Sequence, residues 1–382
     1  MEDRTIELAL RDDAVRGDAE AQNRLGMLYS SGKGLPPDWQ QATGWFRRAA
    51  EQGHASAQFN LGLVYGNGQG VRQDLQQALV WYRKAAHQGH AKAQFNLGLM
   101  FDNGQGVPQD YEQARAWYNE AAVQGHAGAQ NNLGLMFVNG HGVRRDYHTA
   151  MDWFRKAAEQ GDAAAQNNLG MIFGNQNDVP QDFGKALFWY RKAADQGYAN
   201  ARFNLATLYE NGEGIAQDYV QALFWYRAAA AQNHAKAQFN LGLLYDLGRG
   251  VPADAQQAMS WYRQAAERGH ARAQFNLGMR YDSGQGVAQD YQQALSWYRR
   301  AAEQGHARAQ FNLALMYLVG HGATADLVLA YKWFTLAEST SGAGELGDKS
   351  VRYRHLAEAR MTAQQLEQGG AMVQEWRQRQ AS

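Results

Sequence analysis

Apolar and polar positions along the chain repeat with a period of thirty-six residues. Leucine keeps this spacing from Leu25 to Leu313. Tryptophan keeps it without an insertion or deletion, at Trp45, Trp81, Trp117, Trp153, Trp189, Trp225, Trp261, Trp297 and Trp333. Nine uninterrupted copies of one pattern predict a single repeat array and not a set of unrelated domains.

Each copy contains two helical patterns. In residues 53–88, apolar residues such as Leu61 recur at the three- and four-residue spacing of a helix face. Gly68 follows them and suits the left-handed residue that ends a helix. Asp74 is a typical N-cap for a second helix, and Gln77 stands at the offset of a capping box. We therefore predict that each copy is a helical hairpin.

Such a hairpin cannot cover its own apolar face, so neighbouring copies must stack. Residues before Gly17 match only a second helix, and the period fades after Trp333. Thr362, with Gln365 at the capping-box offset, predicts a last amphipathic helix that has Trp376 near its end. The expected domains are an N-terminal capping helix over residues 1–16, nine repeats over 17–340 and C-terminal capping helices over 341–382. The expected fold is an all-α solenoid.

Composition excludes several functions. Lys+Arg and Asp+Glu are 37 each, so the chain lacks the basic surplus that binding to nucleic acid needs. There is no cysteine, which excludes disulfides and thiolate metal sites. We find neither a signal-peptide pattern nor an apolar run long enough for a membrane span, and so expect a cytoplasmic protein without a membrane span.

The residues that repeat also resemble a known family. The segment 91–98 reads AKAQFNLG and is followed by Trp117-Tyr118, and this string is similar to the Sel-one-like repeat (SLR) family, which is related to the tetratricopeptide repeat. The resemblance covers residues 17 to about 340. It implies a right-handed superhelix whose first helices line a concave surface, and a role as an adaptor or scaffold that holds proteins. One secreted bacterial branch joins each repeat by a disulfide, and a chain without cysteine departs from that branch.

No pattern predicts catalysis, a metal or a cofactor. Six histidines recur one repeat apart, at His54, His90, His126, His234, His270 and His306. Because stacked helices lie about 8–10 Å apart, these side chains are too far from one another for one metal ion, and we interpret them as residues at the start of first helices. The paired glycines of the loops lack a phosphate-binding pattern and indicate helix ends. Each repeat offers one capping aspartate, which makes no acid/base pair.

An asparagine recurs in the first helix of eight repeats, and by resemblance to tetratricopeptide repeats this position faces the groove. The row comprises Asn60, Asn96, Asn132, Asn168, Asn204, Asn240, Asn276 and Asn312. An amide can donate to and accept from a peptide backbone, so the row could bind a polypeptide of any sequence. Alternatively, each asparagine holds the adjoining helix or loop in register. The sequence leaves both interpretations open.

The pattern changes in the middle of the chain. Most of these asparagines follow a phenylalanine, such as Phe95 or Phe203, but Asn131 and Asn167 take its place there. A groove lined with aromatic rings would therefore be replaced by paired amides, which suggests a specific site. The loop of Asn175, Gln176, Asn177 and Asp178 also loses both of its glycines.

Charged residues vary along the predicted groove. Cations lie near the start of several first helices and carboxylates, such as Asp102 and Glu210, near the end. Either these charges pair across repeats, or they select a partner. Arg144 and Arg145 form a basic cluster with two histidines on the loop edge.

The sequence thus predicts a non-enzymatic scaffold that binds a protein or extended peptide in its groove. Asn96, Asn132, Asn168 and Asn204 are the candidate backbone contacts, Asn131 and Asn167 add polar contacts, and Phe95 and Phe203 are apolar anchors. Asp102 and Glu210 are the candidate charged contacts. The alternative is an inhibitor or immunity-type protein that wraps and blocks a toxin or enzyme, with Arg144 and Arg145 at its edge.

Overall fold

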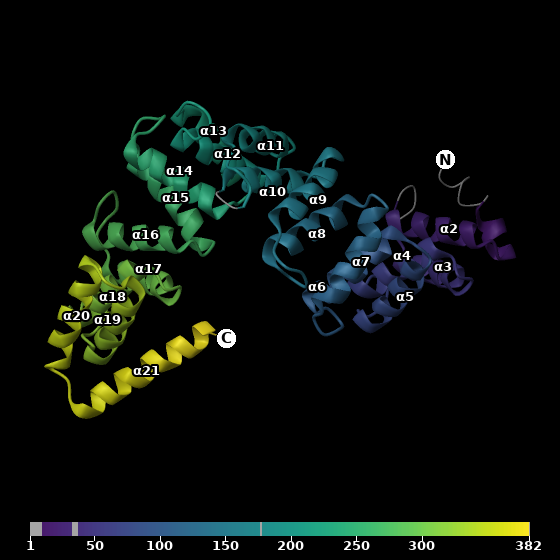
Figure 1. Ribbon diagram of the computed structural model, residues 1–382. Coiled ribbons are helices and arrows are strands. Elements are labelled where there is room, and N and C mark those ends of the chain that lie inside the picture. The colour runs from purple at the N-terminus through teal and green to yellow at the C-terminus, as the bar shows by residue number, and fades with distance from the viewer. Residues whose placement is uncertain (1–9, 33–36, 176–177, 382) are drawn as a thin grey trace. The chain divides into compact units, whose positions relative to one another are not determined.

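The computed structural model describes residues 10–32, 37–175 and 178–381, and all regular elements within them are helices (Figure 1). The first helices of the repeats are α2 (Ala19–Ser31), α4 (Ala55–Asn67), α6 (Ala91–Asn103), α8 (Ala127–Asn139), α10 (Ala163–Gly174), α12 (Ala199–Asn211), α14 (Ala235–Leu247), α16 (Ala271–Ser283) and α18 (Ala307–Val319). The second helices are α3 (Trp39–Glu51), α5 (Leu75–His87), α7 (Tyr111–Val123), α9 (Tyr147–Glu159), α11 (Phe183–Asp195), α13 (Tyr219–Ala230), α15 (Ala255–Glu267), α17 (Tyr291–Glu303) and α19 (Leu327–Ser341). Two further helices follow, α20 (Glu345–Glu358) and α21 (Ala363–Ala381).

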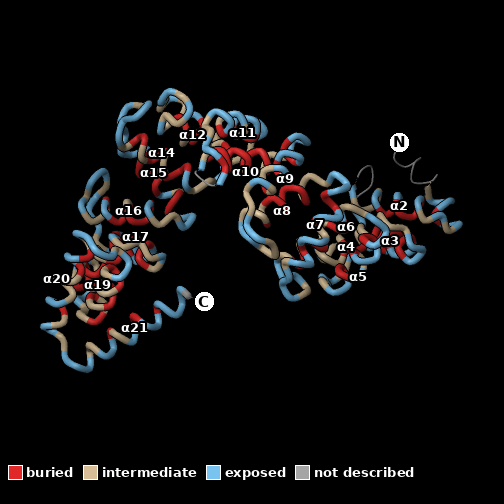
Figure 2. Tube along the Cα trace, in the orientation of Figure 1, coloured by how far each residue is buried: buried red, intermediate tan, exposed pale blue. Residues whose placement is uncertain are grey.

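The chain forms two compact units, residues 1–196 with α2–α11 and residues 197–382 with α12–α21. Within each unit, a first helix packs most extensively on the second helix of its own repeat and next on the second helix of the repeat before it. Buried residues lie where these helices face one another, as Figure 2 shows. This stacking of helical hairpins confirms the predicted all-α solenoid.

The ends of the helices follow from local sequence. At the second helix of the typical repeat, the Asp74 carboxylate accepts the backbone N–H of Gln77 at 3.0 Å, as an N-cap does. The backbone N–H of Asp74 donates to the carbonyl of Tyr65 at 2.9 Å and not to the side chain of Gln77. The expected capping box is therefore only half made. Gly68, with φ 70°, ends α4 in the left-handed conformation predicted for it.

Close packing between the two helices of a repeat depends on a small residue in the first. A Cβ atom added to Gly62 would lie 2.5 Å from the Tyr82 ring, so glycine at this position lets α5 approach α4 closely. The tyrosines equivalent to Tyr82 are among the largest fully buried side chains of the described residues, at Tyr118, Tyr226, Tyr262 and Tyr298. Each of these tyrosines places a hydroxyl group next to the first helices, where it can form the hydrogen bonds described below.

Two helices, α20 and α21, follow the last repeat. Thr362 and Gln365 form a complete capping box at the start of α21, with hydrogen bonds of 2.8 and 3.2 Å. α21 packs on α19, and the indole Nε1 of Trp376 donates to Glu303 at 3.0 Å. At the N-terminal side, residues 10–16 are helical. Residues 1–9 of the predicted N-terminal capping helix lie outside the described residues.

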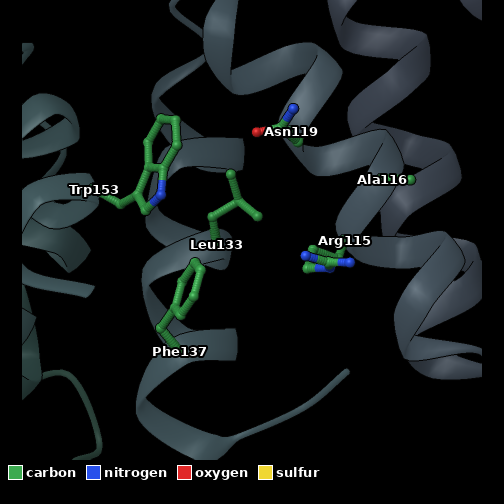
Figure 3. Close-up of a pocket in the computed structure, with 6 residues that line it drawn as sticks. All are labelled: Arg115, Ala116, Asn119, Leu133, Phe137 and Trp153. Atoms are coloured by element: carbon green, nitrogen blue, oxygen red, sulfur yellow. The ribbon is translucent and has the colours of Figure 1, made fainter. Parts of the chain in front are cut away.

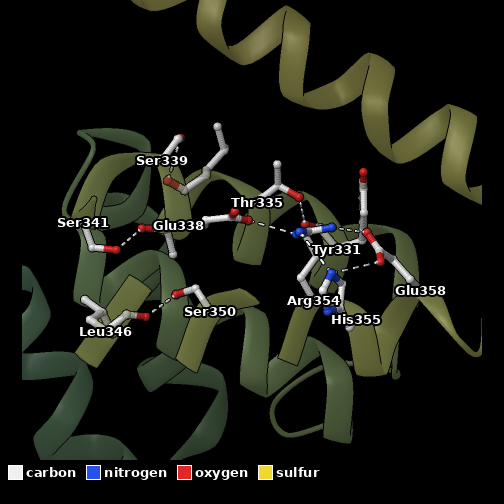
Figure 4. Close-up of polar contacts among 12 residues, drawn as sticks. Tyr331, Thr335, Glu338, Ser339, Ser341, Leu346, Ser350, Arg354, His355 and Glu358 are labelled. Atoms are coloured by element: carbon white, nitrogen blue, oxygen red, sulfur yellow. Dashed lines mark hydrogen bonds and ion pairs between the residues drawn. The ribbon is translucent and has the colours of Figure 1, made fainter. Parts of the chain in front are cut away.

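α20 is joined to α19 by a charged network (Figure 4). The Arg354 Nε atom lies 2.9 Å from the Glu338 carboxylate of α19, and the same guanidinium also pairs with Glu358 of α20. Only 19% of the Arg354 side chain is exposed, and both carboxylates raise its pKa against the effect of burial. The network therefore holds α20 against the last repeat.

Candidate functional site

The asparagines among the candidate site residues form a recurring set of hydrogen bonds with tyrosines of the second helices. In the second unit, the Asn240 amide Nδ2 donates to the Tyr226 hydroxyl at 2.8 Å, and Tyr226 belongs to the second helix of the preceding repeat. Equivalent hydrogen bonds join Asn96 to Tyr82 and Asn132 to Tyr118. The asparagine row thus holds neighbouring helices together, as its structural interpretation requires. Contact with a ligand stays a proposal.

The tyrosine hydroxyls in turn donate to the carboxylates near the ends of the first helices. Tyr118 donates to Asp102 at 3.1 Å, and Tyr226 donates to Glu210 at 2.6 Å. Burial is the main reason that the pKa of both tyrosines is raised, and the adjacent carboxylate raises it further. Asp102 and Glu210 are therefore acceptors inside an amide–hydroxyl–carboxylate chain, and the hydroxyl groups stay protonated.

The two asparagines that break the pattern are more buried than their neighbours in the row. Asn131 is 8% exposed and Asn167 is 3% exposed, whereas Asn132 and Asn168 are half-buried. Asn131 accepts from the Asn168 amide at 2.9 Å, and the Asn167 amide lies 3.5 Å from the sulfur of Met171. Asn131 is thus bonded to the asparagine of the next repeat, and the expected groove of paired amides stays a prediction.

The phenylalanines of the first helices stack on the histidines of the following repeat. The ring centroids of Phe95 and His126 are 4.6 Å apart, and those of Phe203 and His234 are 4.8 Å apart. Each histidine is also the N-cap of its first helix, because its Nδ1 atom accepts the backbone N–H three residues later. This confirms the interpretation of the histidines as residues that begin helices. Among the described residues, no group of three His, Asp or Glu side chains is arranged to hold a metal ion.

Arg144 and Arg145 lie on the loop between α8 and α9, where both side chains are exposed. His141 of the same loop stacks on Tyr111 at 4.4 Å, so the loop is attached to the start of α7. The predicted basic edge is therefore accessible.

A buried row of glutamines, which the sequence did not predict, links the repeats. Gln58 donates to the carbonyl of Ala50 at 3.1 Å and accepts from Gln88 at 2.7 Å. The same pair joins Gln94 to Gln124 and Gln130 to Gln160. Both glutamine columns are visible in the sequence, thirty residues apart, but nothing in their spacing shows that the two side chains meet. This row is structural.

A cavity of about 400 Å³ opens between α7 and α9 over α8 (Figure 3). It is lined by Arg115, Ala116, Asn119, Leu133, Phe137 and Trp153. Elsewhere an arginine of the second helix donates to a tyrosine of the next first helix, as Arg263 does to Tyr281 at 3.0 Å. Asn119 and Phe137 occupy these two positions in the third and fourth repeats. Because the Asn119 side chain is shorter than an arginine side chain, the space that the arginine would fill stays open as this cavity.

These features define a class of protein, an all-helical repeat protein whose first helices carry recurring asparagines, phenylalanines and charged residues. The Sel1 repeat model matches the chain nine times, at residues 19–54, 55–90, 91–126, 127–162, 163–198, 199–234, 235–270, 271–306 and 307–339. The chain belongs to the Sel1 repeat family.

Solved structures agree with this assignment. The chain is 35% identical to c5321, a protective antigen of uropathogenic Escherichia coli with an SLR fold, over 97% of this chain and 94% of that one, with a TM-score of 0.56. It is also 35% identical to a Sel1 repeat protein from Oxalobacter formigenes, over 81% of this chain and 89% of that one, with a TM-score of 0.62. No curated protein matches the chain significantly. Within the described residues, no helix is long and apolar enough to cross a membrane.

Proposed function

We propose that this protein is a non-enzymatic scaffold that binds a polypeptide partner along the face formed by its first helices. Sel1 repeats are scaffolds that commonly serve protein interaction, and this chain carries nine of them. The supporting observation is that apolar side chains stand exposed on this face beside the asparagine row. Met171 of α10 is 43% exposed, and Met279 of α16 is 39% exposed. An apolar side chain beside an amide suits the alternating side chains and backbone of a peptide.

A small cavity in the first unit fits one apolar side chain of such a partner. It has a volume of about 190 Å³, and Asn168 and Met171 of α10 line it together with Leu135 of α8 and Phe154 of α9. In this proposal, the side chain enters the cavity while the Asn168 carbonyl oxygen accepts a backbone N–H of the partner. The other candidate asparagines, Asn96, Asn132 and Asn204, act in the same way, because an amide oxygen has two lone pairs and can accept a backbone N–H of the partner.

The other candidate contacts have narrower roles. Phe95 and Phe203 are half-buried and offer the partner the ring surface that their histidines leave uncovered. Asn131 and Asn167 position their neighbours, and Asp102 and Glu210 hold the tyrosine hydroxyls in place.

The proposal is tested by capturing partners from a lysate of the source organism on two matched variants. Met171→Glu/Met279→Glu places charge on the first helices, and Val123→Glu/Val220→Glu places the same charge on second helices, at residues that are 66% and 60% exposed. All four sites are surface positions, so both variants are expected to keep the wild-type melting temperature within a few degrees. We expect that the first variant loses a partner that the wild type and the second variant retain. Loss only from the second variant would contradict the proposal.

A second candidate function is that of a blocking protein that wraps a toxin or enzyme. The exposed basic loop at Arg144 and Arg145 favours it. A loop at the edge of the repeats contacts the surface of a folded protein more readily than it contacts an extended peptide. Arg144→Glu/Arg145→Glu discriminates between the two. A scaffold for extended peptides retains its partner in this variant, whereas a blocking protein that uses this edge loses it.

A further inference from the structure

Cations begin three consecutive first helices of the second unit. Lys236, Arg272 and Arg308 lie in the first turns of α14, α16 and α18, and all three side chains are exposed. The N-terminus of a helix carries a partial positive charge, so a cation there is unfavourable for the helix itself. The stability of the helices therefore does not explain why cations stand at these three positions.

Within the described residues, none of these three cations forms an ion pair. The carboxylates of the same face are occupied elsewhere: Asp246 pairs with Arg280, and Asp282 accepts from a tyrosine hydroxyl. Glu345 lies close enough to Arg308 to feel its charge, but its carboxylate pairs with Lys349 at 2.7 Å. The charges do not cancel across repeats, and one edge of the face stays cationic.

A histidine adds a hydrogen-bond donor beside these cations. The Nδ1 atom of His306 accepts the backbone N–H of Ala309 at 3.3 Å, so in the neutral ring the proton is on Nε2. Burial and the two neighbouring arginines, Arg272 and Arg308, keep the pKa of His306 below its ordinary value. The ring is therefore neutral near pH 7 and presents an Nε2–H group.

Other repeats show what this Nε2–H group binds. In the first unit, the Nε2 of His54 lies 2.9 Å from the Glu20 carboxylate, and in the second unit the Nε2 of His234 lies 3.1 Å from the Asn200 oxygen. Glu20 and Asn200 stand thirty-four residues before their histidines, and at the same offset from His306 stands Arg272. Arg272 thus places a second hydrogen-bond donor where Glu20 and Asn200 provide an acceptor.

These donors surround a cavity of about 430 Å³. It is lined by Phe239, Arg272, Phe275, Asn276, His306, Ala307, Arg308 and Leu346. The buried ring of Phe275 stacks on His306 at 4.8 Å and fixes the orientation of the imidazole. Two guanidinium groups and an imidazole N–H over an apolar floor suit a carboxylate on a short aliphatic stem.

We propose that this cavity binds a glutamate or aspartate side chain of the polypeptide that lies on the first helices. The carboxylate takes the place beside His306 that Glu20 takes beside His54, and Arg272 and Arg308 supply its charge-assisted hydrogen bonds. This inference rests on the proposed function and gives the partner a chemical character: the segment that crosses α16 and α18 is acidic.

Two fluorescein-labelled peptides of twelve residues test the proposal by fluorescence anisotropy. One has glutamate at every third position, and the other has glutamine at the same positions. We expect the glutamate peptide to bind the full-length protein at least tenfold more tightly than the glutamine peptide. The difference should shrink as the salt concentration rises from 50 to 300 mM, because salt screens exposed charges. Equal binding of the two peptides, or no binding of either at 1 mM protein, overturns the proposal.

Arg272→Glu is the decisive variant, because it provides an internal carboxylate in the way that Glu20 does. We expect it to bind the glutamate peptide at least tenfold more weakly while the melting temperature stays the same or rises. Lys92→Glu is the matched control: it makes the same change of charge at the equivalent position before His126, outside this cavity, and should leave peptide binding unchanged. Equal losses in both variants would show a general effect of charge and overturn the assignment.

The failure of this inference and that of the proposed function are distinguishable. If Arg272→Glu captures the partner as the wild type does, while Met171→Glu/Met279→Glu does not, the first-helix face binds a partner without this carboxylate pocket. If the peptides behave as expected but Met171→Glu/Met279→Glu leaves capture intact, the cavity binds a carboxylate and the proposed function of the first-helix face fails.

Discussion

The Asn168 amide Nδ2 donates to the Asn131 oxygen 2.9 Å away, across the boundary between two repeats. Asn60 and Asn23 form the same hydrogen bond at 2.9 Å. In both places the residue that is tyrosine in most second helices is phenylalanine, at Phe154 and Phe46. The tyrosine hydroxyl that accepts from the asparagine in the common arrangement is therefore missing. Asn131 and Asn23 replace it as the acceptors.

This exchange predicts that the residues at 131 and 154 are energetically coupled. Asn131→Ala leaves the half-buried amide of Asn168 without its acceptor and should lower the free energy of unfolding by about 1–3 kcal/mol. Asn131→Phe should also destabilise the protein, but less so when it is combined with Phe154→Tyr, since the pair restores the common arrangement. Urea denaturation of the four proteins in this double-mutant cycle measures the coupling.

A coupling energy near zero would contradict the exchange. Phe154→Tyr alone is the control, because a buried hydroxyl added beside an intact Asn131–Asn168 pair should give no gain in stability.

The repeated elements were predictable because each depends on residues close together in sequence. Leu61 and the helix-ending Gly68 predicted the first helix of the typical repeat, and Thr362 with Gln365 predicted the capping box of α21, which the structure contains. The capping box expected at Asp74 was only half right. Its backbone N–H is taken by Tyr65, a contact made by the folding of the loop, and the spacing of Asp74 and Gln77 carries no information about that loop.

The candidate site was less predictable because its contacts join different repeats. The sequence located the asparagine row, but it could not show that Tyr226 lies under Asn240, since the two belong to neighbouring hairpins. It likewise left open whether the charged residues pair with one another. The structure shows that Glu210 accepts from the Tyr226 hydroxyl instead.

Stability should depend on pH through the histidine N-caps. Burial, then Arg272 and Lys236, lower the pKa of His270 to about 4 from its ordinary value of 6.5. Protonation removes the Nδ1 acceptor that caps α16, so the unfolded state takes up the proton more readily than the folded state does. The contribution of His270 is complete above pH 6.5 and is lost as the pH falls from 6.5 towards 4. The urea midpoint should therefore be lower at pH 5 than at pH 7.

His270→Asp tests the origin of this dependence. Asp162 caps α10 at the equivalent position and accepts from Ala165 at 2.8 Å, so an aspartate preserves the cap at both pH values. The other histidines still titrate, and we expect the variant to show a smaller fall of the midpoint between pH 7 and pH 5, not its disappearance. An unchanged fall would assign the pH dependence to other groups.

The cavity beside Trp153 should close when the common residue pair is restored. Asn119→Arg with Phe137→Tyr recreates the contact that Arg263 makes with Tyr281. The longer side chain covers apolar surface that is now open, and we expect a gain of about 0.5–1 kcal/mol in the free energy of unfolding. Phe137→Tyr alone adds a hydroxyl without its donor and should give no gain. A stabilised single variant would show that the arginine is irrelevant to the hollow.

Two glutamines of the buried row, Gln238 and Gln310, have an Oε1 atom without a hydrogen-bond partner among the described residues, and a substitution should repair the defect at Gln238. Gln238 is fully buried, and its Oε1 atom has no hydrogen-bond partner among the described residues. In the next repeat, Gln304 donates to the corresponding atom of Gln274 at 2.7 Å, but Arg268 stands where Gln238 needs that donor and bonds to Asn233 instead. Arg268→Gln should satisfy the buried oxygen and raise the free energy of unfolding by about 1–2 kcal/mol.

The reverse exchange in the neighbouring repeat is the matched control. Gln304→Arg removes the donor from Gln274 and should lower the free energy of unfolding by a similar amount, since it creates the defect that Gln238 now has. Urea denaturation of the wild type and both variants measures the two changes on one scale. Opposite signs are expected because the same buried oxygen gains a partner in one variant and loses it in the other. Changes of the same sign would show that the arginine acts through its surface contacts and not through the glutamine row.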